Sequence, residues 1–344
     1  MVLSYQSFSL PFQYPFTISK GTKTHQPTLV TQLSHLGLTG VGEAPAIAYY
    51  NVTTELMEQV CKAKKMFIEK FAFTEPERYW HYLHHLLPAH PFLVCALDMA
   101  GWDLFGKMKR KKCYELFGGD ITHNPVTDYT IGIDTIEKMV EKCKAKPWPI
   151  YKIKLGTDRD IEIVESLRKH TDAVLRIDAN AAWTADEALE KIKAFSQLGV
   201  EFIEQPLAKD DWAGMEKLFA ESPLPLYADE SCVFETDVEK CVNHFHGINI
   251  KLTKCSGITP ALRMIQNARK LDLKIMLGSM NESTIGSSAI AHLMPLVDHV
   301  DVDGPLLLAE DLATGFTFNN DGSINYAEGN GLGVKLNQPI VIGQ

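Results

Sequence analysis

The run Tyr151-Lys-Ile-Lys154 opens a series of short apolar segments, each of which ends on a charged residue or a glycine. The later members are Leu175-Arg-Ile-Asp178, Phe202-Ile-Glu204, Leu226-Tyr-Ala-Asp229, Ile248-Asn-Ile-Lys251, Ile275-Met-Leu-Gly278 and His299-Val-Asp-Val-Asp303. Their spacing of roughly 22 to 27 residues is the length of one strand and one helix. Because a buried parallel strand tolerates a charge only where its side chain emerges, we expect these charges to share one rim of a barrel.

Helical segments separate these strands. Asp128-Tyr-Thr-Ile-Gly-Ile133 supplies a first strand, and helical apolar spacing occurs over residues 134–146, 158–170 and 235–245. Thr184-Ala-Asp-Glu187 predicts a capping box, and Thr259-Pro260 predicts a helix whose N-cap is Thr259. Eight strands that alternate with helices, with no glycine-rich phosphate turn after the first, predict a closed α/β barrel.

The first 115 or so residues have a different pattern. Alternating apolar residues predict strands at 29–33 and 38–43, and helical spacing follows at 55–71 and 91–106. Glycine and proline punctuation at Gly118-Gly119 and Asn124-Pro125 separates this part from the barrel strands. An α+β unit therefore precedes the barrel.

Composition restricts the class of protein. The 344 residues carry a formal net charge of -9, which disfavours nucleic acid and anionic membrane surfaces as partners. The seven cysteines form no C-x-x-C pair, as expected for reduced thiols inside a cell. The chain starts without the features of a signal peptide, and it has no apolar run of about 20 residues that would span a membrane. We therefore expect a cytoplasmic protein.

Three carboxylates end successive predicted strands: Asp178, Glu204 and Asp229. Neighbouring strands lie about 4.8 Å apart, so these groups can converge, and three close anions require a compensating cation. Ligation by oxygen alone, without paired His or Cys, favours Mg²⁺. We expect Glu230, which follows Asp229, to support or replace a ligand, and Asn180 to orient one.

Three lysines face the same rim. Lys152 and Lys154 alternate along one strand and so point to one face, and Lys251 ends the strand across the barrel axis from Lys154. Neighbouring ammonium groups are expected to lower the pKa of at least one lysine and so to provide a neutral amine. A carbon atom held between Lys154 and Lys251 would then have one amine on each face.

Taken together, these motifs resemble the muconate-lactonising subgroup of the enolase superfamily over nearly the whole chain. The matching segments are Gly42-Glu-Ala-Pro45, Ala96-Leu-Asp-Met-Ala-Gly-Trp-Asp-Leu104, Lys152-x-Lys154, Asp178-Ala-Asn180, Glu204-Gln-Pro206, Asp229-Glu-Ser231 and Lys251. The resemblance implies a modified (β/α)8 TIM barrel under an α+β capping domain. It divides the chain into a capping domain (1–120), a barrel (121–310) and a C-terminal segment that returns to the capping domain (311–344). It also implies one Mg²⁺ per subunit, which stabilises an enediolate formed when a substrate loses its α-proton.

Within this subgroup, Asp301-Val-Asp303 resembles the D-x-D pair of dipeptide epimerases, which holds the substrate's α-ammonium group. The segment Gly278-Ser-Met280 with Glu282 also resembles these epimerases, so that Ser279, Met280 and Asn281 are expected at the substrate. Relatives acting on Ala-Glu have an arginine in a loop of the capping domain, where this chain offers Lys20 or Lys23.

The expected reaction is a two-base 1,1-proton transfer at the α-carbon of the C-terminal residue of an Ala-Xaa dipeptide, such as Ala-Ala or Ala-Glu. The alternatives are a cycloisomerase or an o-succinylbenzoate synthase-like lyase of the same superfamily, and a protein that only binds. The resemblance also implies a homo-oligomer.

Overall fold

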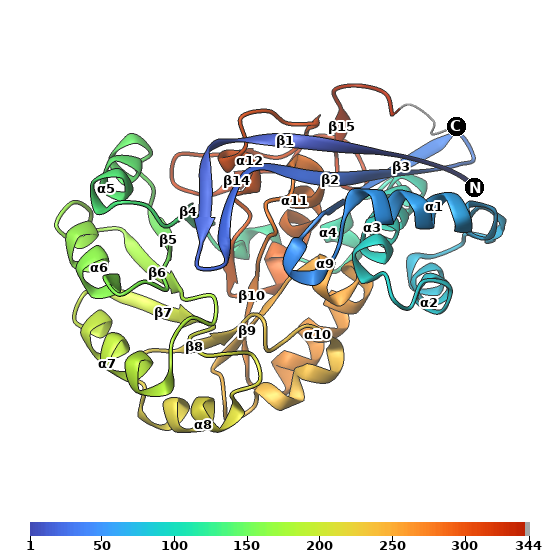
Figure 1. The fold of residues 1–344 in the computed structure, drawn as a ribbon. Coiled ribbons are helices and arrows are strands. Elements are labelled where there is room, and N and C mark those ends of the chain that lie inside the picture. The colour runs from blue at the N-terminus through green and yellow to red at the C-terminus, as the bar shows by residue number, and fades with distance from the viewer. Residues whose placement is uncertain (341–344) are drawn as a thin grey trace.

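In the computed structural model of the chain, which describes residues 1–340, the centre is an eight-stranded parallel sheet with the strand order β11-β10-β9-β8-β7-β6-β5-β4 (Figure 1). The strands are β4 (Tyr129–Ile131), β5 (Ile150–Lys154), β6 (Val174–Asp178), β7 (Val200–Glu204), β8 (Leu226–Ala228), β9 (Gly247–Ile250), β10 (Lys274–Leu277) and β11 (His299–Val300). The order follows the chain, so each strand lies beside its predecessor, as the barrel prediction requires. The predicted α/β barrel is confirmed.

The sheet closes through a weak join. Thr127 and Val300 form an isolated parallel bridge, and the Val302 N–H donates a hydrogen bond to Thr127 Oγ1 at 3.1 Å. We call this join, made by Thr127, Val300 and Val302, the seam. The strand predicted over residues 299–303 is correspondingly short, because β11 ends at Val300 and the chain then leaves the sheet.

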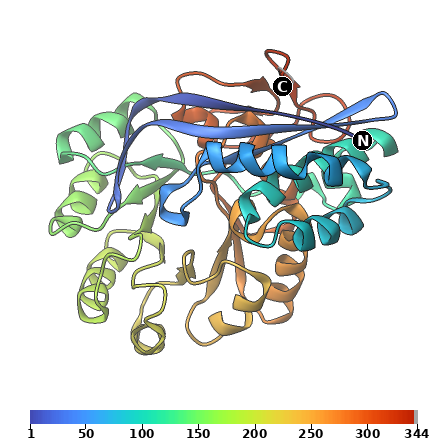
Figure 2. The ribbon, with the colours of Figure 1, turned by 45° about the vertical axis from the view of Figure 1, so that its right-hand side comes forward.

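Helices connect the strands around the outside of the sheet (Figures 1 and 2). They are α5 (Ile136–Ala145), α6 (Asp160–Arg168), α7 (Ala185–Ser196), α8 (Trp212–Glu221), α9 (Leu252–Cys255), α10 (Ile258–Lys270), α11 (Thr284–Leu293) and α12 (Gly304–Leu307). The capping box of α7 is confirmed, since the Thr184 N–H donates to Glu187 Oε2 at 2.9 Å and the Glu187 N–H to Thr184 Oγ1 at 3.4 Å.

Two helix predictions need correction. Residues 235–245 form only the short 3₁₀ turns Glu235–Asp237 and Glu239–Cys241. Two tight turns bury the apolar side chains of Val238 and Cys241 as a continuous helix would, so the apolar spacing alone does not distinguish the two structures. Helix α10 starts at Ile258, with Gly257 as its N-cap at φ 137°, a conformation suited to glycine. Thr259 thus lies inside the first turn, where its hydroxyl donates to Asp98 Oδ1 at 2.7 Å.

The first part of the chain forms the cap. It consists of an antiparallel sheet, β1 (Val2–Ile18), β2 (Gly21–His35) and β3 (Leu38–Pro45), and the helices α1 (Thr54–Lys70), α2 (Pro76–Leu86), α3 (Pro91–Lys109) and α4 (Cys113–Leu116). The register of β1 on β2 shifts between Pro11 and Phe16. Proline cannot donate to the sheet, and the long hairpin bends here so that its turn approaches the barrel (Figures 1 and 2).

Two glycines let β3 pack directly on the backbone of α3. A Cβ atom at Gly42 would lie 1.9 Å from the Ala96 carbonyl oxygen, and one at Gly40 would lie 2.0 Å from that of Ala100. This close packing brings the side chain of the next residue, Glu43, to the start of α11 in the barrel domain. Glu43 is fully buried and accepts hydrogen bonds from the Ser283 N–H (3.1 Å), the Ser283 hydroxyl (2.7 Å) and the Gly286 N–H (2.9 Å) at the start of α11. The cap is thereby fixed to the barrel.

The last described residues form two small antiparallel pairs, β12 (Ala313–Thr314) with β15 (Lys335–Leu336) and β13 (Thr317–Phe318) with β14 (Ile324–Asn325). The Leu332 N–H donates to Asp103 Oδ1 of α3 at 2.8 Å, so this segment touches the cap. The domain limits at residues 120 and 310 stay predictions, and residues 341–344 of the predicted C-terminal segment lie outside the described residues.

Apolar residues form one large core around the barrel and a second within the cap. All seven cysteines are free and buried. Over residues 1–340, no helix is both long enough and apolar enough to cross a membrane.

Candidate active site

The three predicted metal ligands meet at the end of neighbouring strands. The sheet register pairs Lys154 with Asp178 and Asp178 with Glu204, which places these side chains side by side. Asp178, Glu204 and Asp229 are buried, and each offers a carboxylate oxygen within 4.8 Å of the others. The convergence expected from the sequence is therefore present.

The three predicted lysines contact these carboxylates. Lys152 Nζ lies 2.8 Å from Glu204 Oε2, 3.3 Å from Asp178 Oδ2 and 2.9 Å from Asp301 Oδ2. Lys154 Nζ donates to Asp178 Oδ2 at 2.5 Å. Across the barrel, Lys251 Nζ donates to Asp229 Oδ2 at 2.7 Å. Each of Lys154 and Lys251 is thus held by a different carboxylate.

Carboxylates outweigh the neighbouring ammonium groups in setting the pKa of Lys152 and of Lys251. Burial by itself would lower the pKa of Lys152, but Asp301, Glu204 and Asp178 outweigh it, and the pKa is raised well above its usual value. Burial likewise opposes the charge of Lys251, and Asp229 outweighs it to raise the pKa. The sequence argument considered the neighbouring ammonium groups and not the carboxylates that each lysine touches.

The carboxylates fit a hard cation. Burial opposes ionisation of Asp178, yet Lys154 and Lys152 lower its pKa to about 2. Burial and the neighbouring Asp178 raise the pKa of Glu204 to about 7, although Lys152 lies close to it. The lysines do not fully offset the negative charge that Glu204 would carry when ionised. The cluster therefore offers the carboxylate oxygens and the negative charge that suit Mg²⁺.

The two predicted acids after β11 lie next to each other at the seam. Asp303 Oδ2 accepts a hydrogen bond from the Thr130 N–H at 2.6 Å, and Asp301 Oδ2 accepts one from Lys152. The other oxygen of each, Oδ1, is buried and receives no N–H donor from residues 1–340, and the two carboxyl groups lie within hydrogen-bond reach of each other. Burial and the adjacent Asp301 raise the pKa of Asp303 well above its usual value. A cation with N–H donors would satisfy both free oxygens.

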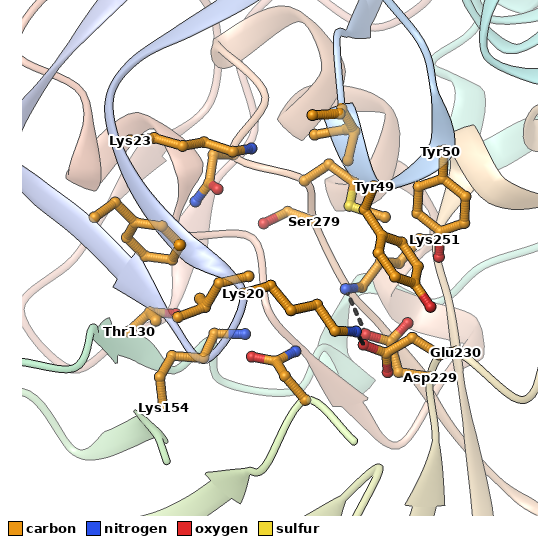
Figure 3. A pocket seen from close by; sticks show the side chains of 18 of the residues that line it. Lys20, Lys23, Tyr49, Tyr50, Thr130, Lys154, Asp229, Glu230, Lys251 and Ser279 are labelled. Atoms are coloured by element: carbon orange, nitrogen blue, oxygen red, sulfur yellow. Dashed lines mark hydrogen bonds and ion pairs between the residues drawn. The ribbon is translucent and has the colours of Figure 1, made fainter. Parts of the chain in front are cut away.

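A cavity of about 280 Å³ lies between the cap and these residues. Most of the predicted site residues line it, namely Lys20, Lys23, Lys154, Asn180, Asp229, Glu230, Lys251, Ser279, Met280, Asn281, Asp301 and Asp303. Figure 3 shows Lys154 and Lys251 reaching toward it from different parts of the barrel. Lys152, Asp178 and Glu204 do not line the cavity.

The hairpin turn of the cap covers part of this cavity. Lys20 Nζ donates to Glu230 Oε1 at 3.0 Å and lies 4.0 Å from the centre of the Tyr49 ring (Figure 3). Glu230, expected to support or replace a metal ligand, is therefore paired with the cap. Lys23 Nζ donates to Gln26 Oε1 at 3.3 Å, and burial together with Lys251 lowers the Lys23 pKa.

Asn180 contacts the predicted metal ligand Asp178 through its main chain. Its backbone N–H donates to Asp178 Oδ1 at 2.9 Å, while its side-chain Oδ1 is buried without a partner in residues 1–340. The main chain, and not the amide side chain, holds Asp178.

Sequence reasoning missed several residues of the site. Lys254 Nζ donates to Asp229 Oδ1 at 2.6 Å, and Asn249 Nδ2 donates to Glu204 Oε1 at 2.7 Å. Asn249 was visible as a polar residue within the apolar run Ile248 to Ile250, and Lys254 follows Lys251 by one helical turn. Tyr49, Tyr50 and Thr130 line the cavity as well, and no local pattern distinguished them.

Comparisons with known proteins agree with this geometry. Residues 6–118 match the N-terminal domain of the mandelate racemase / muconate lactonizing enzyme family, and residues 134–340 match the enolase C-terminal domain-like family. The chain is 50% identical to an L-Ala-D/L-amino acid epimerase of Flavobacterium johnsoniae over 336 residues, which are 98% of this chain and 100% of the relative.

Two solved structures share the whole fold. A substrate-liganded complex of the L-Ala-D/L-Glu epimerase from Bacillus subtilis has a TM-score of 0.92 at 27% identity, covering 97% of this chain and 98% of the other. A dipeptide epimerase from Enterococcus faecalis V583, complexed with Mg and the dipeptide L-Leu-L-Tyr, has a TM-score of 0.91 at 28% identity, with the same coverage. The chain therefore belongs to the mandelate racemase / muconate lactonizing enzyme family of the enolase superfamily.

Proposed function

We propose that this protein is a Mg²⁺-dependent dipeptide epimerase, which inverts the α-carbon of the C-terminal residue by a two-base proton transfer. One observation carries the proposal: Lys154 and Lys251 extend into one cavity from strands on opposite sides of the barrel. Each is bound to a separate acid of the carboxylate cluster. The epimerase activity of the relative that is 50% identical supports it.

Asp178, Glu204 and Asp229 are the residues that would hold the metal. Bound there, Mg²⁺ would bind the substrate carboxylate and stabilise the negative charge that develops as the α-proton leaves. Because the three acids are buried and close together, they need no large rearrangement to serve as ligands.

The lysines would move the proton. The neutral amine of one lysine takes the α-proton on one face of the carbon, and the ammonium group of the other gives a proton to the opposite face. After one turnover the first lysine is charged and the second is neutral, so the pair is set for the reverse direction. Lys152 contacts Glu204 and Asp301 and does not line the cavity, so it would act on the substrate through these two acids.

Asp301 and Asp303 would bind the dipeptide's ammonium group. Their Oδ1 atoms are buried beside the cavity and receive no N–H donor from residues 1–340, and an ammonium group would supply such donors. A cycloisomerase or a lyase acting on a substrate without an amine has no use for these two acids. The geometry thus favours the epimerase over the alternatives.

The substrate side chain would meet the cap hairpin and the loop Ser279 to Asn281. Lys20 forms an ion pair with Glu230, whereas Lys23 forms no ion pair within residues 1–340 and donates to Gln26 instead. An Ala-Xaa dipeptide, with Ala-Ala and Ala-Glu among the candidates, fits this mixed polar and apolar wall. The homo-oligomeric state and the cytoplasmic location stay predictions.

A dipeptide library in deuterated water tests the proposal. Each dipeptide that is epimerised gains one mass unit at its α-carbon, whichever stereoisomer is supplied. We expect Lys251→Ala to abolish epimerisation and to retain proton exchange from one stereoisomer only, through Lys154. Normal epimerisation by this variant would disprove the two-base mechanism, and no exchange by the wild-type protein with any Ala dipeptide would disprove the function.

A further inference from the structure

Lys254 is a buried lysine whose role the proposed reaction leaves open. Its side chain is fully buried on α9, one helical turn after Lys251. Its ammonium group donates to Asp229 Oδ1 at 2.6 Å, to the Asp229 carbonyl at 2.5 Å, to the Cys232 carbonyl at 3.1 Å and to the Asn249 carbonyl at 3.3 Å. A buried charge with this many acceptors has one fixed position.

The contacts divide the Asp229 carboxylate into two different oxygens. Oδ1 is bound by Lys254, which is fully buried, and Oδ2 is bound by Lys251, which lines the cavity. Asp178 is held in another way, since its Oδ1 accepts the Asn180 N–H and its Oδ2 faces Lys154 and Lys152. Asp229 is therefore the ligand whose two oxygens are bound by two different lysines.

We propose that Lys254 is a positioning residue, which locks Asp229 so that Oδ2 faces the cavity and the metal site. The inference rests on the proposed function, because it assumes that Asp229 binds Mg²⁺. Lys254 also contacts the main chain at both ends of the Asp229–Cys232 turn and at Asn249, so it fixes the backbone around Asp229 as well as its carboxylate.

The positive charge of Lys254 has two opposite effects on Mg²⁺ binding, and they can be told apart. A cation 2.6 Å from a ligand oxygen repels a second cation, so its removal would strengthen Mg²⁺ binding if electrostatics alone mattered. If Lys254 orients the ligand, its removal weakens Mg²⁺ binding despite the added negative charge. Loss of a group that orients a metal ligand typically reduces metal affinity about 10- to 100-fold.

The test measures the Kd of Mg²⁺ by isothermal titration calorimetry, without substrate, and the denaturant midpoint of each protein. We expect Lys254→Met to weaken Mg²⁺ binding about 10- to 100-fold. Lys254→Gln, which keeps a donor and loses the charge, should bind Mg²⁺ with an affinity between those of Lys254→Met and wild type. It also serves as the test variant if Lys254→Met does not fold.

Lys107→Met is the matched control. Lys107 Nζ donates to the buried Asp103 Oδ2 at 2.7 Å and to the Thr39 carbonyl at 2.7 Å in the cap, so its loss should lower stability and leave the Kd of Mg²⁺ unchanged. Mg²⁺ binding by either Lys254 variant that is as tight as in the wild type, or tighter, would overturn the inference. A wild-type protein that binds no Mg²⁺ would instead overturn the proposed metal site, and the inference with it.

Discussion

Replacing Gly42 by alanine should separate the cap sheet from its central helix. The added Cβ would lie 1.9 Å from the Ala96 carbonyl oxygen and 2.8 Å from the Ala100 nitrogen. Contacts between such atoms are comfortable at about 3.5 Å, so β3 and α3 would have to move apart by about 1.5 Å. Both groups belong to the backbone of α3, and no side-chain rotation can relieve the clash.

The expected cost follows from this geometry. Overpacking costs about 1 to 3 kcal/mol where neighbours can adjust, and a clash with helix backbone should reach or exceed about 3 kcal/mol. The next residue, Glu43, holds Ser283 and Gly286, so the same movement should disturb the loop from Ser279 to Asn281 at the cavity. The KM for the dipeptide should therefore rise together with the loss of stability.

Urea unfolding followed by circular dichroism measures the first effect, and initial rates of proton exchange measure the second. Gly101→Ala on α3 is the control, because its Cβ would meet a side-chain ring atom, Tyr79 Cδ1, at 3.1 Å. Alanine also favours the helix over glycine by about 1 kcal/mol, so this variant should stay within about 1 kcal/mol of wild type. A Gly42→Ala protein as stable as Gly101→Ala would refute the packing argument.

Three further outcomes are expected. Burial raises the pKa of Asp98 from 3.8 to about 7, so the folded protein holds this proton more tightly than the unfolded chain. Its stabilising effect is full below pH 4 and is lost as the pH rises to 7, by up to about 1.4 kcal/mol per pH unit, and urea titrations of Asp98→Asn should lack this slope. Asp178→Asn should abolish the calorimetric signal of Mg²⁺ binding; an unchanged signal would exclude Asp178 as a ligand. Asp301→Asn should raise the KM of an Ala dipeptide about 10- to 150-fold, the equivalent of one charge-assisted hydrogen bond, and unchanged kinetics would place the ammonium group elsewhere.

The barrel and its rim could be predicted because a charged residue in a buried apolar strand is rare. It is tolerated where the side chain emerges at the end of the strand. Lys154, Asp178 and Glu204 each stand at the end of an apolar run, and the sheet register pairs them on adjacent strands. Local chemistry also predicted the capping box at Thr184, where both partners lie within four residues.

The features that could not be predicted depend on contacts between residues far apart in the chain. Thr259 looked like an N-cap, but its hydroxyl is taken by Asp98, 161 residues earlier in the chain. The pairing of Lys20 with Glu230 spans 210 residues, and no local pattern indicates it. The helix predicted at residues 235–245 failed because the same apolar spacing also suits two tight turns. Lysine pKa values could not be judged without knowing which carboxylate each ammonium group touches.

The seam has a consequence for how this protein can diverge. At that join, side chains supply two of the hydrogen bonds between the strand ends, since Asp303 accepts from the Thr130 N–H and Thr127 accepts from the Val302 N–H. Asp303, which is proposed to bind the substrate's ammonium group, therefore also helps to close the barrel. A descendant in which Asp303 is replaced would need other hydrogen bonds at the seam to stay folded. The hairpin turn at Lys20 carries no barrel strand, so mutations there are free of this constraint. New side-chain preferences should thus arise in the cap long before the amine requirement is lost.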